Sequence, residues 1–199
     1  MLIVPINAKE IRLIPKNFNS DGLLDPGTYI ATFDEVRNSI LVIGNNYSLT
    51  WDAAWRSHLI NQAEILVTQL WDVGIDDVFL DGSFVENKDH PNDIDGYFDP
   101  HLSMYDPVDM KKFEELISKL NNLDPHKIWD WDRYSRRSVP GFHKRQLPMW
   151  IAYRVELYPH LNAGITGIKD ANGNDLKFPA AFRQSRNEFK QKGIIKVIR

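Results

Sequence analysis

Apolar residues recur along the first half of the chain with the spacing of two helices. Thr32-Phe-Asp-Glu35 is a capping box that would open the first helix. The apolar side of this helix is formed by Val36, Ile40 and Ile43. A longer helix is predicted from about Trp51 to Trp71, because apolar residues recur there every three or four positions and Gly74 follows as a C-terminal cap. Both helices should pack one side against a core.

Four runs in the rest of the chain predict strands. Asp77–Asp81 is a short apolar strand, and a polar loop over residues 86–92 separates it from a second strand, Asp93–Phe98. Met149–Tyr158 alternates between apolar and polar residues, which predicts a third strand. Ile194–Ile198 is a final apolar strand.

The connecting segments carry further signals. Asp106 followed by Pro107 predicts the start of a helix that runs to about Leu120. Its inward residues would be Met110, Phe113, Leu116, Ile117 and Leu120. Residues 1–28 are rich in Pro, Asn and Gly and predict an irregular arm with one short strand at Glu10–Ile14. A last helix is predicted near Ala180–Lys190.

This order of elements predicts an α/β or α+β fold, with a short mixed sheet flanked by helices and the two acidic strands at its edge. We expect one domain over residues 1–199. In this domain an N-terminal arm (1–30) and a C-terminal extension (159–199) would wrap a catalytic core (31–158).

Composition narrows the class of protein. The chain has 199 residues, of which 43% are hydrophobic, and a net charge of -3, which argues against disorder and against strong non-specific binding to nucleic acid. It has no Cys, so disulfides and thiolate metal sites are excluded. No apolar run is long enough for a membrane span and no signal peptide is evident, so we expect a cytoplasmic protein without a membrane partner.

The second strand carries a pair of carboxylates. Asp93 and Asp95 are two residues apart, so both side chains should project from one face while Ile94 and Phe98 point into the core. Paired carboxylates are favourable when a cation neutralises them, and oxygen ligands suit Mg²⁺ or Mn²⁺. The preceding turn, Gly82-Ser83, offers backbone amides and a hydroxyl that can donate to phosphate oxygens.

The pair also has two simpler interpretations. Asp93 and Asp95 could belong to a solvated turn, since Asn and Gly surround them. A calcium-binding EF-hand loop does not fit, because its first position would fall on Pro91 and its twelfth on Leu102.

Leu80-Asp-Gly82-Ser83-Phe, followed by Asp93-Ile-Asp95-Gly, resembles the signature of the polymerase-beta-like nucleotidyltransferase superfamily. The longer string Asn92-Asp-Ile-Asp-Gly-Tyr-Phe-Asp-Pro100 is similar to an uncharacterised bacterial and phage branch of it. Leu24-Asp-Pro-Gly27 and Lys192-Gly-Ile-Ile-Lys-Val-Ile198 are similar to that branch as well. The superfamily contains enzymes that act on RNA, antibiotic adenylyltransferases, and toxin or antitoxin proteins.

The resemblance implies a third carboxylate on a later strand, and Glu156 has the right phase, opposite Val155 and Leu157. It further implies that Asp93, Asp95 and Glu156 are catalytic and hold two Mg²⁺ or Mn²⁺ ions. Without the resemblance, Glu156 could equally be a carboxylate paired with Arg154.

A basic loop, residues 133–145, precedes Glu156. Arg136, Arg137 and Lys144 could bind the triphosphate of a nucleotide together with Gly82 and Ser83, or this loop could simply pair with the acidic surface. Four aromatic residues lie in or near it, and we expect these to pack rather than to stack on bases: Trp129, Trp131, Tyr134 and Phe142.

The predicted function is transfer of a nucleoside monophosphate from an NTP to an acceptor hydroxyl, with RNA, a protein or a small molecule as acceptor. Two alternatives stay open. One is a non-catalytic module of the same fold that binds a protein partner, as an antitoxin would. The other is a metal-dependent phosphodiesterase that uses the same acids with water as nucleophile.

Overall fold

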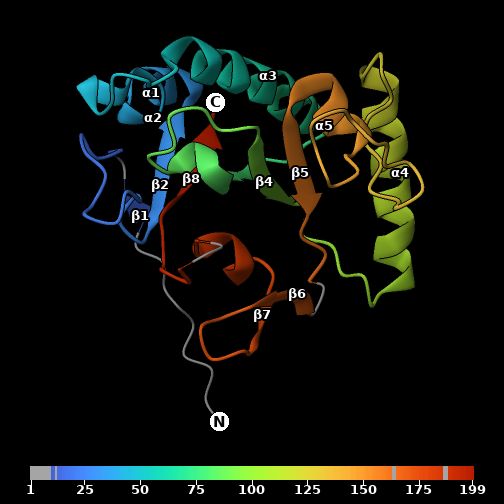
Figure 1. The fold of residues 1–199 in the computed structure, drawn as a ribbon. Coiled ribbons are helices and arrows are strands. Elements are labelled where there is room, and N and C mark those ends of the chain that lie inside the picture. Colours follow the sequence, from blue (N-terminus) through green and yellow to red (C-terminus); the bar gives the residue numbers. More distant parts are fainter. Residues whose placement is uncertain (1–9, 12, 163–164, 186–187) are drawn as a thin grey trace.

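The computed structural model describes residues 10–11, 13–162, 165–185 and 188–199. Its centre is a six-stranded mixed sheet in the order β1-β2-β8-β3-β4-β5 (Figure 1). The strands are Glu10–Ile11 (β1), Thr28–Thr32 (β2), Asp77–Asp81 (β3), Ile94–Asp99 (β4), Val155–Pro159 (β5) and Ile194–Ile198 (β8). A separate antiparallel hairpin pairs Ile165–Lys169 (β6) with Asp175–Lys177 (β7). The predicted α+β class is therefore confirmed.

The α-helices of the described residues are Phe33–Arg37 (α1), Ile40–Ile43 (α2), Ala53–Asp72 (α3), Pro107–Leu123 (α4) and Pro148–Tyr153 (α5). Short 3-10 turns lie at Gly44–Asn46 (η1), Gly82–Val85 (η2) and Ala180–Arg183 (η3). Among the described residues, no helix combines the length and the apolar character that crossing a membrane requires.

Helix α3 covers one face of the sheet. Its buried apolar residues share one core with the inward side chains of the strands. On α3 these are Leu59, Ile60, Ala63, Leu66, Val67 and Leu70. On the sheet they include Val78, Leu80, Ile94, Phe98, Val155, Leu157, Ile195 and Val197, all of which are inaccessible to solvent. The alternation of each strand leaves the intervening residues on the opposite face.

The opposite face is partly covered by the C-terminal segment, which Figure 1 shows on the side of the sheet away from α3. Tyr97 of β4 stacks on Phe79 of β3 with ring centroids 4.6 Å apart. Phe178 and Phe182 pack against Tyr97 at 5.4 and 5.3 Å. Aromatic contacts therefore fill the middle of this face.

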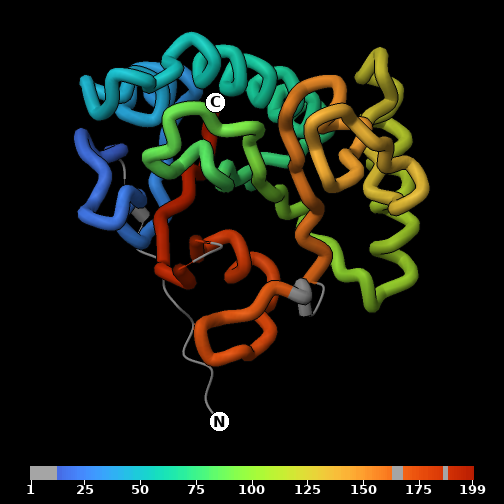
Figure 2. The backbone as a smooth tube through the Cα atoms, in the orientation of Figure 1, coloured from blue at the N-terminus to red at the C-terminus, as the bar shows by residue number. Residues whose placement is uncertain are grey.

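Strand β8, which belongs to the predicted C-terminal extension, lies inside the sheet. β8 lies between β2 and β3, parallel to β2 and antiparallel to β3 (Figure 2). Three strands of this sheet lie outside the predicted core of residues 31–158 or at its N-terminal border, namely β1, β2 and β8. The acidic strand pair is likewise interior, since β8 pairs with β3 on one side and β5 with β4 on the other. An apolar run predicts burial of β8, but not the strands that flank it.

The predicted third strand has a different form. Met149–Tyr158 was expected to be one strand, but Pro148–Tyr153 is a helix and only Val155–Pro159 is a strand. Pro148 stands at the first helical position, where its fixed φ favours a helix. Arg154 then adopts a left-handed conformation with φ 56°, which ends the helix and starts the strand.

The predicted helix near Ala180–Lys190 was also wrong. The described part of this stretch forms one 3-10 turn, Ala180–Arg183, followed by extended backbone at Gln184. The first predicted helix is divided as well: the capping box at Thr32 is present, but Ser39 caps a second helix. Ile43 is consequently exposed. β1 occupies only Glu10–Ile11, and residues 1–9 and 12 lie outside the described residues.

One buried charge joins the helices to the loop after β3. The Arg56 side chain of α3 is inaccessible to solvent and donates to the carbonyl oxygens of Leu41, Phe84, Glu86 and Lys88 at 2.6 to 2.9 Å. Its guanidinium also lies 4.0 Å from the centroid of a Trp51 ring. Arg56 therefore fixes the backbone that leads from the Gly82-Ser83 turn toward β4.

We expect Arg56→Met to lower the free energy of unfolding by about 3 kcal/mol or more, because it leaves four backbone acceptors without their donor. Arg133→Met, at an exposed position, should change it by less than about 0.5 kcal/mol. Urea denaturation of both variants measures the difference. Equal stability of the two variants would contradict the structural role of Arg56.

Candidate active site

Three carboxylates lie side by side across three strands. Asp81 of β3 pairs with Asp95 of β4, and Asp95 pairs with Glu156 of β5. Residues directly opposite one another on neighbouring strands project from the same face. Asp81, Asp95 and Glu156 therefore form a row, which we call the acidic row, on the face of the sheet that α3 does not cover.

The strand sequences explain why the acidic row faces away from the core. Leu80, Ile94 and Val155 each adjoin one of the three acids and are completely buried. Because side chains alternate along a strand, burial of these residues turns their acidic neighbours to the other side. Asp95 and Glu156 thus lie on the face that their position in the sequence predicted.

The Gly82-Ser83 turn packs directly onto Asp95. Gly82 has φ +76°, and a Cβ atom at this position would lie 2.5 Å from Oδ2 of Asp95. Phe84 and Val85, which follow in η2, are completely buried and anchor the turn. A residue without a side chain is therefore required here on two grounds, the backbone conformation and the close approach of Asp95.

Lys192 compensates the charge at one end of the acidic row. It is only 3% exposed, and its ammonium lies 3.2 Å from Asp81 Oδ1 and 2.6 Å from Glu86 Oε1. It also donates to the carbonyl oxygen of Gly82 at 2.9 Å. Burial alone would lower the pKa of Lys192, but Asp81 and Glu86 outweigh burial and raise it. Lys192 thus ties the start of β8 to the turn.

Glu156 forms the other end of the acidic row and is also 3% exposed. The Tyr158 hydroxyl donates to its Oε2 at 2.6 Å. Lys144 Nζ lies 3.6 Å from Oε2, and an Arg136 guanidinium nitrogen lies 3.9 Å from Oε1. Burial and the neighbouring Glu156 charge raise the pKa of Tyr158, so this hydroxyl stays a donor. The cations near Glu156 thus come from the basic loop. Arg154, the partner considered from the sequence, instead lies 3.9 Å from a Trp150 ring centroid.

Asp93 precedes β4 and is held by a neighbouring helix. The indole nitrogen of Trp150 in α5 donates to Asp93 Oδ2 at 2.7 Å. Trp150 is itself buried, so this contact has a fixed geometry. Asp93, two residues before Asp95 in the sequence, therefore has one oxygen already engaged.

The other predicted residues take different positions. Arg136 and Lys144 approach Glu156, but Arg137 is exposed and its backbone pairs with that of Gln146. Ser83 lies in η2 beside Gly82. Of the aromatic residues near the basic loop, Trp129 is buried, Trp131 packs against the core and Phe142 packs on Trp150, as predicted; Tyr134 is exposed.

Two residues of the site were not singled out from the sequence for their roles. Lys192 lies more than a hundred residues after Asp81, and nothing local to it signals this pairing. Tyr158 could have been found from the strand phase, because a residue two positions after Glu156 lies on the same face.

The carboxylate oxygens of this region are of the type that binds divalent cations in proteins. Glu156 Oε1 is buried and has no hydrogen-bond donor among the residues that the structure describes, which is the condition of an oxygen able to accept a metal ion. Within the same residues, no group of three or more Asp, Glu or His side chains is arranged to hold a metal ion by itself. A magnesium ion held here would take its remaining ligands from water or from a bound phosphate.

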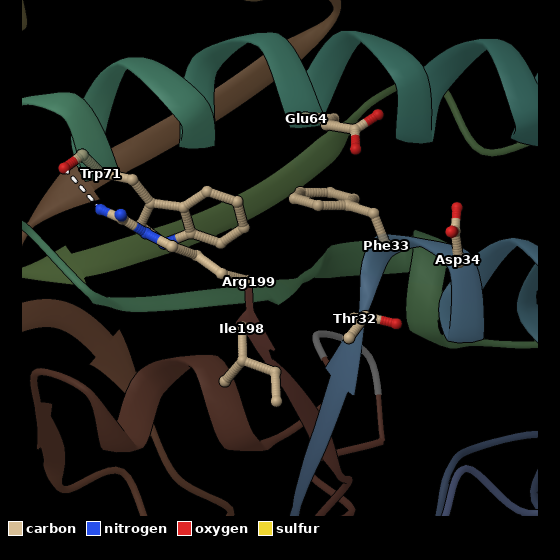
Figure 3. A pocket seen from close by; sticks show the side chains of 7 residues that line it. All are labelled: Thr32, Phe33, Asp34, Glu64, Trp71, Ile198 and Arg199. Carbon is tan, nitrogen blue, oxygen red and sulfur yellow. Dashed lines mark hydrogen bonds between the residues drawn. The ribbon is translucent and has the colours of Figure 1, made fainter.

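A separate hollow of about 250 Å³ lies at the other end of β8, and Figure 3 shows its lining. In it, the Arg199 guanidinium lies along the Trp71 indole and donates to the Trp71 carbonyl oxygen at 2.8 Å. The hollow begins where β2 and β8 end, at Thr32 and Ile198, whereas the acidic row lies near the start of β8. It therefore does not include any residue of the predicted site.

Comparison with known proteins gives a family but no activity. A family of unknown function, DUF6932, matches residues 16–198. The chain belongs to this family. The match runs from before β2 to the end of β8, so it contains the whole acidic row, Lys192 and the basic loop. No curated protein and no solved structure matches the chain.

The contact between Gly82 and Asp95 can be tested against a second glycine. Gly74 also has a positive φ, +89°, but a Cβ atom there would meet nothing within 4 Å. Gly82→Ala should therefore lower the free energy of unfolding by about 1–2 kcal/mol more than Gly74→Ala, because only Gly82→Ala adds a clash to the backbone strain. Thermal and urea denaturation measure this difference. If Gly82→Ala cost no more than Gly74→Ala, the turn would not pack on Asp95.

Burial raises the pKa of Asp81 to about 6, although Lys192 acts in the opposite direction. In the unfolded chain the pKa of an Asp is about 3.9. At a pH between these two pKa values, Asp81 is protonated in the folded protein but ionised in the unfolded chain. Asp81 therefore makes the free energy of unfolding fall as pH rises from about 4 to 6.

Asp81→Asn should remove that part of the pH dependence. Urea denaturation at pH 4, 5, 6 and 7 gives the stability of the wild type minus that of the variant, and we expect this difference to decrease with pH. A difference that is constant or rises over this range would contradict the raised pKa of Asp81.

Proposed function

We propose that this protein is a metal-dependent nucleotidyltransferase, which transfers a nucleoside monophosphate from an NTP to an acceptor hydroxyl. One observation carries the proposal: Asp95 and Glu156 face each other in register on β4 and β5, while Gly82 packs on Asp95. Paired carboxylates beside a glycine turn provide oxygen ligands and phosphate-binding amides within one small region.

The proposed roles follow from the contacts of each residue. Asp93, Asp95 and Glu156 would hold Mg²⁺ or Mn²⁺, which when bound stabilises the attacking and leaving oxygens of an in-line displacement. Trp150 orients Asp93, and Tyr158 orients Glu156, through the hydrogen bonds already described. The backbone amides of the Gly82-Ser83 turn and the Ser83 hydroxyl would donate to phosphate oxygens.

The charges around the acidic row support the proposal. Arg136 and Lys144 lie beside Glu156, where they can reach phosphate groups of an NTP bound to the row. Lys192 pairs with Asp81, so the proposed metal ligands of the row are Asp95 and Glu156. The acceptor can be RNA, a protein or a small molecule.

A second candidate is a non-catalytic binding module of the same fold. It is favoured by the pairing of Glu156 with Arg136 and Lys144, which balances the charge of Glu156 without a metal ion. Such a module would bind a protein partner, as in an antitoxin-like role, and would lack nucleotide binding that depends on Mn²⁺. A thermal-shift measurement with Mn²⁺ and each NTP separates the two candidates.

Incubation of the purified protein with Mn²⁺, each α-labelled NTP and a cell extract should label one size class of acceptor. Asp95→Asn and Glu156→Gln should each lower the transfer rate by about a hundredfold or more, because each removes a metal-binding oxygen while keeping the shape of the side chain. The exposed Asp72→Asn at the end of α3 is the matched control and should retain wild-type activity.

Wild-type transfer by both Asp95→Asn and Glu156→Gln would contradict the proposal. Release of free nucleotide without a labelled acceptor would also contradict it and would indicate a phosphodiesterase, in which water replaces the acceptor hydroxyl.

A further inference from the structure

Glu156 is a buried carboxylate whose two counter-charges stay at a distance. Lys144 Nζ and the Arg136 guanidinium lie 3.6 and 3.9 Å from its oxygens. Strong hydrogen bonds between charged groups are about 2.7–2.9 Å long, so neither cation forms one here. Oε1 has no hydrogen-bond donor within the described part of the chain. The cations therefore balance the charge of Glu156 without saturating its oxygens.

The two cations are also weakly held by the rest of the protein. The Arg136 guanidinium donates to the Arg145 carbonyl at 3.3 Å and to the Tyr158 hydroxyl at 3.5 Å, both long contacts. The Lys144 side chain is 60% exposed. The base of the loop is firmer, because the backbones of Arg137 and Gln146 exchange hydrogen bonds of 2.9 and 2.8 Å. The loop thus keeps its place while its two cations are able to change partner.

We propose that Arg136 and Lys144 form a binding site for a polyphosphate anion, and that Glu156 occupies this site as an internal competitor when no anion is bound. The identification of the natural ligand as a nucleoside triphosphate rests on the proposed function. The site itself requires only phosphate oxygens, for which guanidinium and ammonium groups are the usual partners in proteins.

Charge balance explains why the internal pair matters. Drawing Arg136 and Lys144 toward a phosphate leaves the Glu156 carboxylate buried without compensation, which is strongly unfavourable. A polyphosphate that binds alone must overcome this cost. One that arrives with a divalent cation supplies the replacement charge, so Glu156 favours the metal-bound form of the ligand over the free anion.

The test uses inorganic tripolyphosphate and the full chain in buffer with EDTA, and isothermal titration calorimetry measures its dissociation constant. Glu156→Gln should bind tripolyphosphate about tenfold more tightly than the wild type, because the competing charge is gone. Arg136→Gln and Lys144→Gln should each bind it about fivefold or more weakly. Arg137→Gln, a charge-matched control in the same loop, should stay within about twofold of the wild type.

A double-mutant cycle separates competition from a general change of charge. The gain from Glu156→Gln should vanish when Arg136 and Lys144 are both replaced by Gln, because no site is then left for which to compete. An equal gain in both backgrounds would overturn the proposal, as would unchanged or weaker binding by Glu156→Gln. Urea denaturation of each variant verifies the fold, and the loop variants test the site even if Glu156→Gln is unstable.

The outcome is distinguishable from that of the transfer assay. Tighter binding by Glu156→Gln without any labelled acceptor would leave the anion site standing and refute nucleotidyl transfer. Metal-dependent transfer with no gain in tripolyphosphate binding by Glu156→Gln would support nucleotidyl transfer and refute the competition between Glu156 and the anion.

Discussion

The register between β3, β4 and β5 is the constraint on which the rest of this structure depends. Asp81, Asp95 and Glu156 lie opposite one another, and each is flanked by an apolar residue that the core buries. A shift of one residue in any of these strands would exchange its two faces, placing a carboxylate against α3 and an apolar side chain on the opposite face. The core under α3 thus determines where the acidic row points.

Compensation of charge is the second requirement, because three neighbouring carboxylates repel one another. The chain supplies cations from segments distant in sequence: Lys192 for Asp81, and Arg136 with Lys144 for Glu156. These two arrangements differ. Lys192 is buried and also bound to the turn, whereas Lys144 is exposed and no donor from the basic loop hydrogen-bonds Glu156 among the described residues. The cation beside Asp81 is therefore fixed in place, whereas the cations beside Glu156 are able to change partner.

Local patterns predicted the elements whose signals are local. The bounds of β3 and β8 were predicted correctly, as was most of α3, because apolar periodicity and caps decide them. Alternation misled at Pro148–Tyr153, where one proline and a left-handed Arg154 outweigh it. The central place of β8 and the pairing of Lys192 with Asp81 depend on contacts between distant segments, which no local pattern encodes. The phase of Glu156 was predicted correctly, since alternation in the short strand β5 is enough to define its face.

The most direct test of the account is a crystal structure of the protein grown with Mn²⁺ and a non-hydrolysable nucleoside triphosphate. We expect an anomalous manganese peak bound to oxygens of Asp95 and Glu156, with Arg136 and Lys144 on the phosphates. A bound nucleotide elsewhere, or Glu156 still paired with these two cations and no manganese beside Asp95, would contradict it.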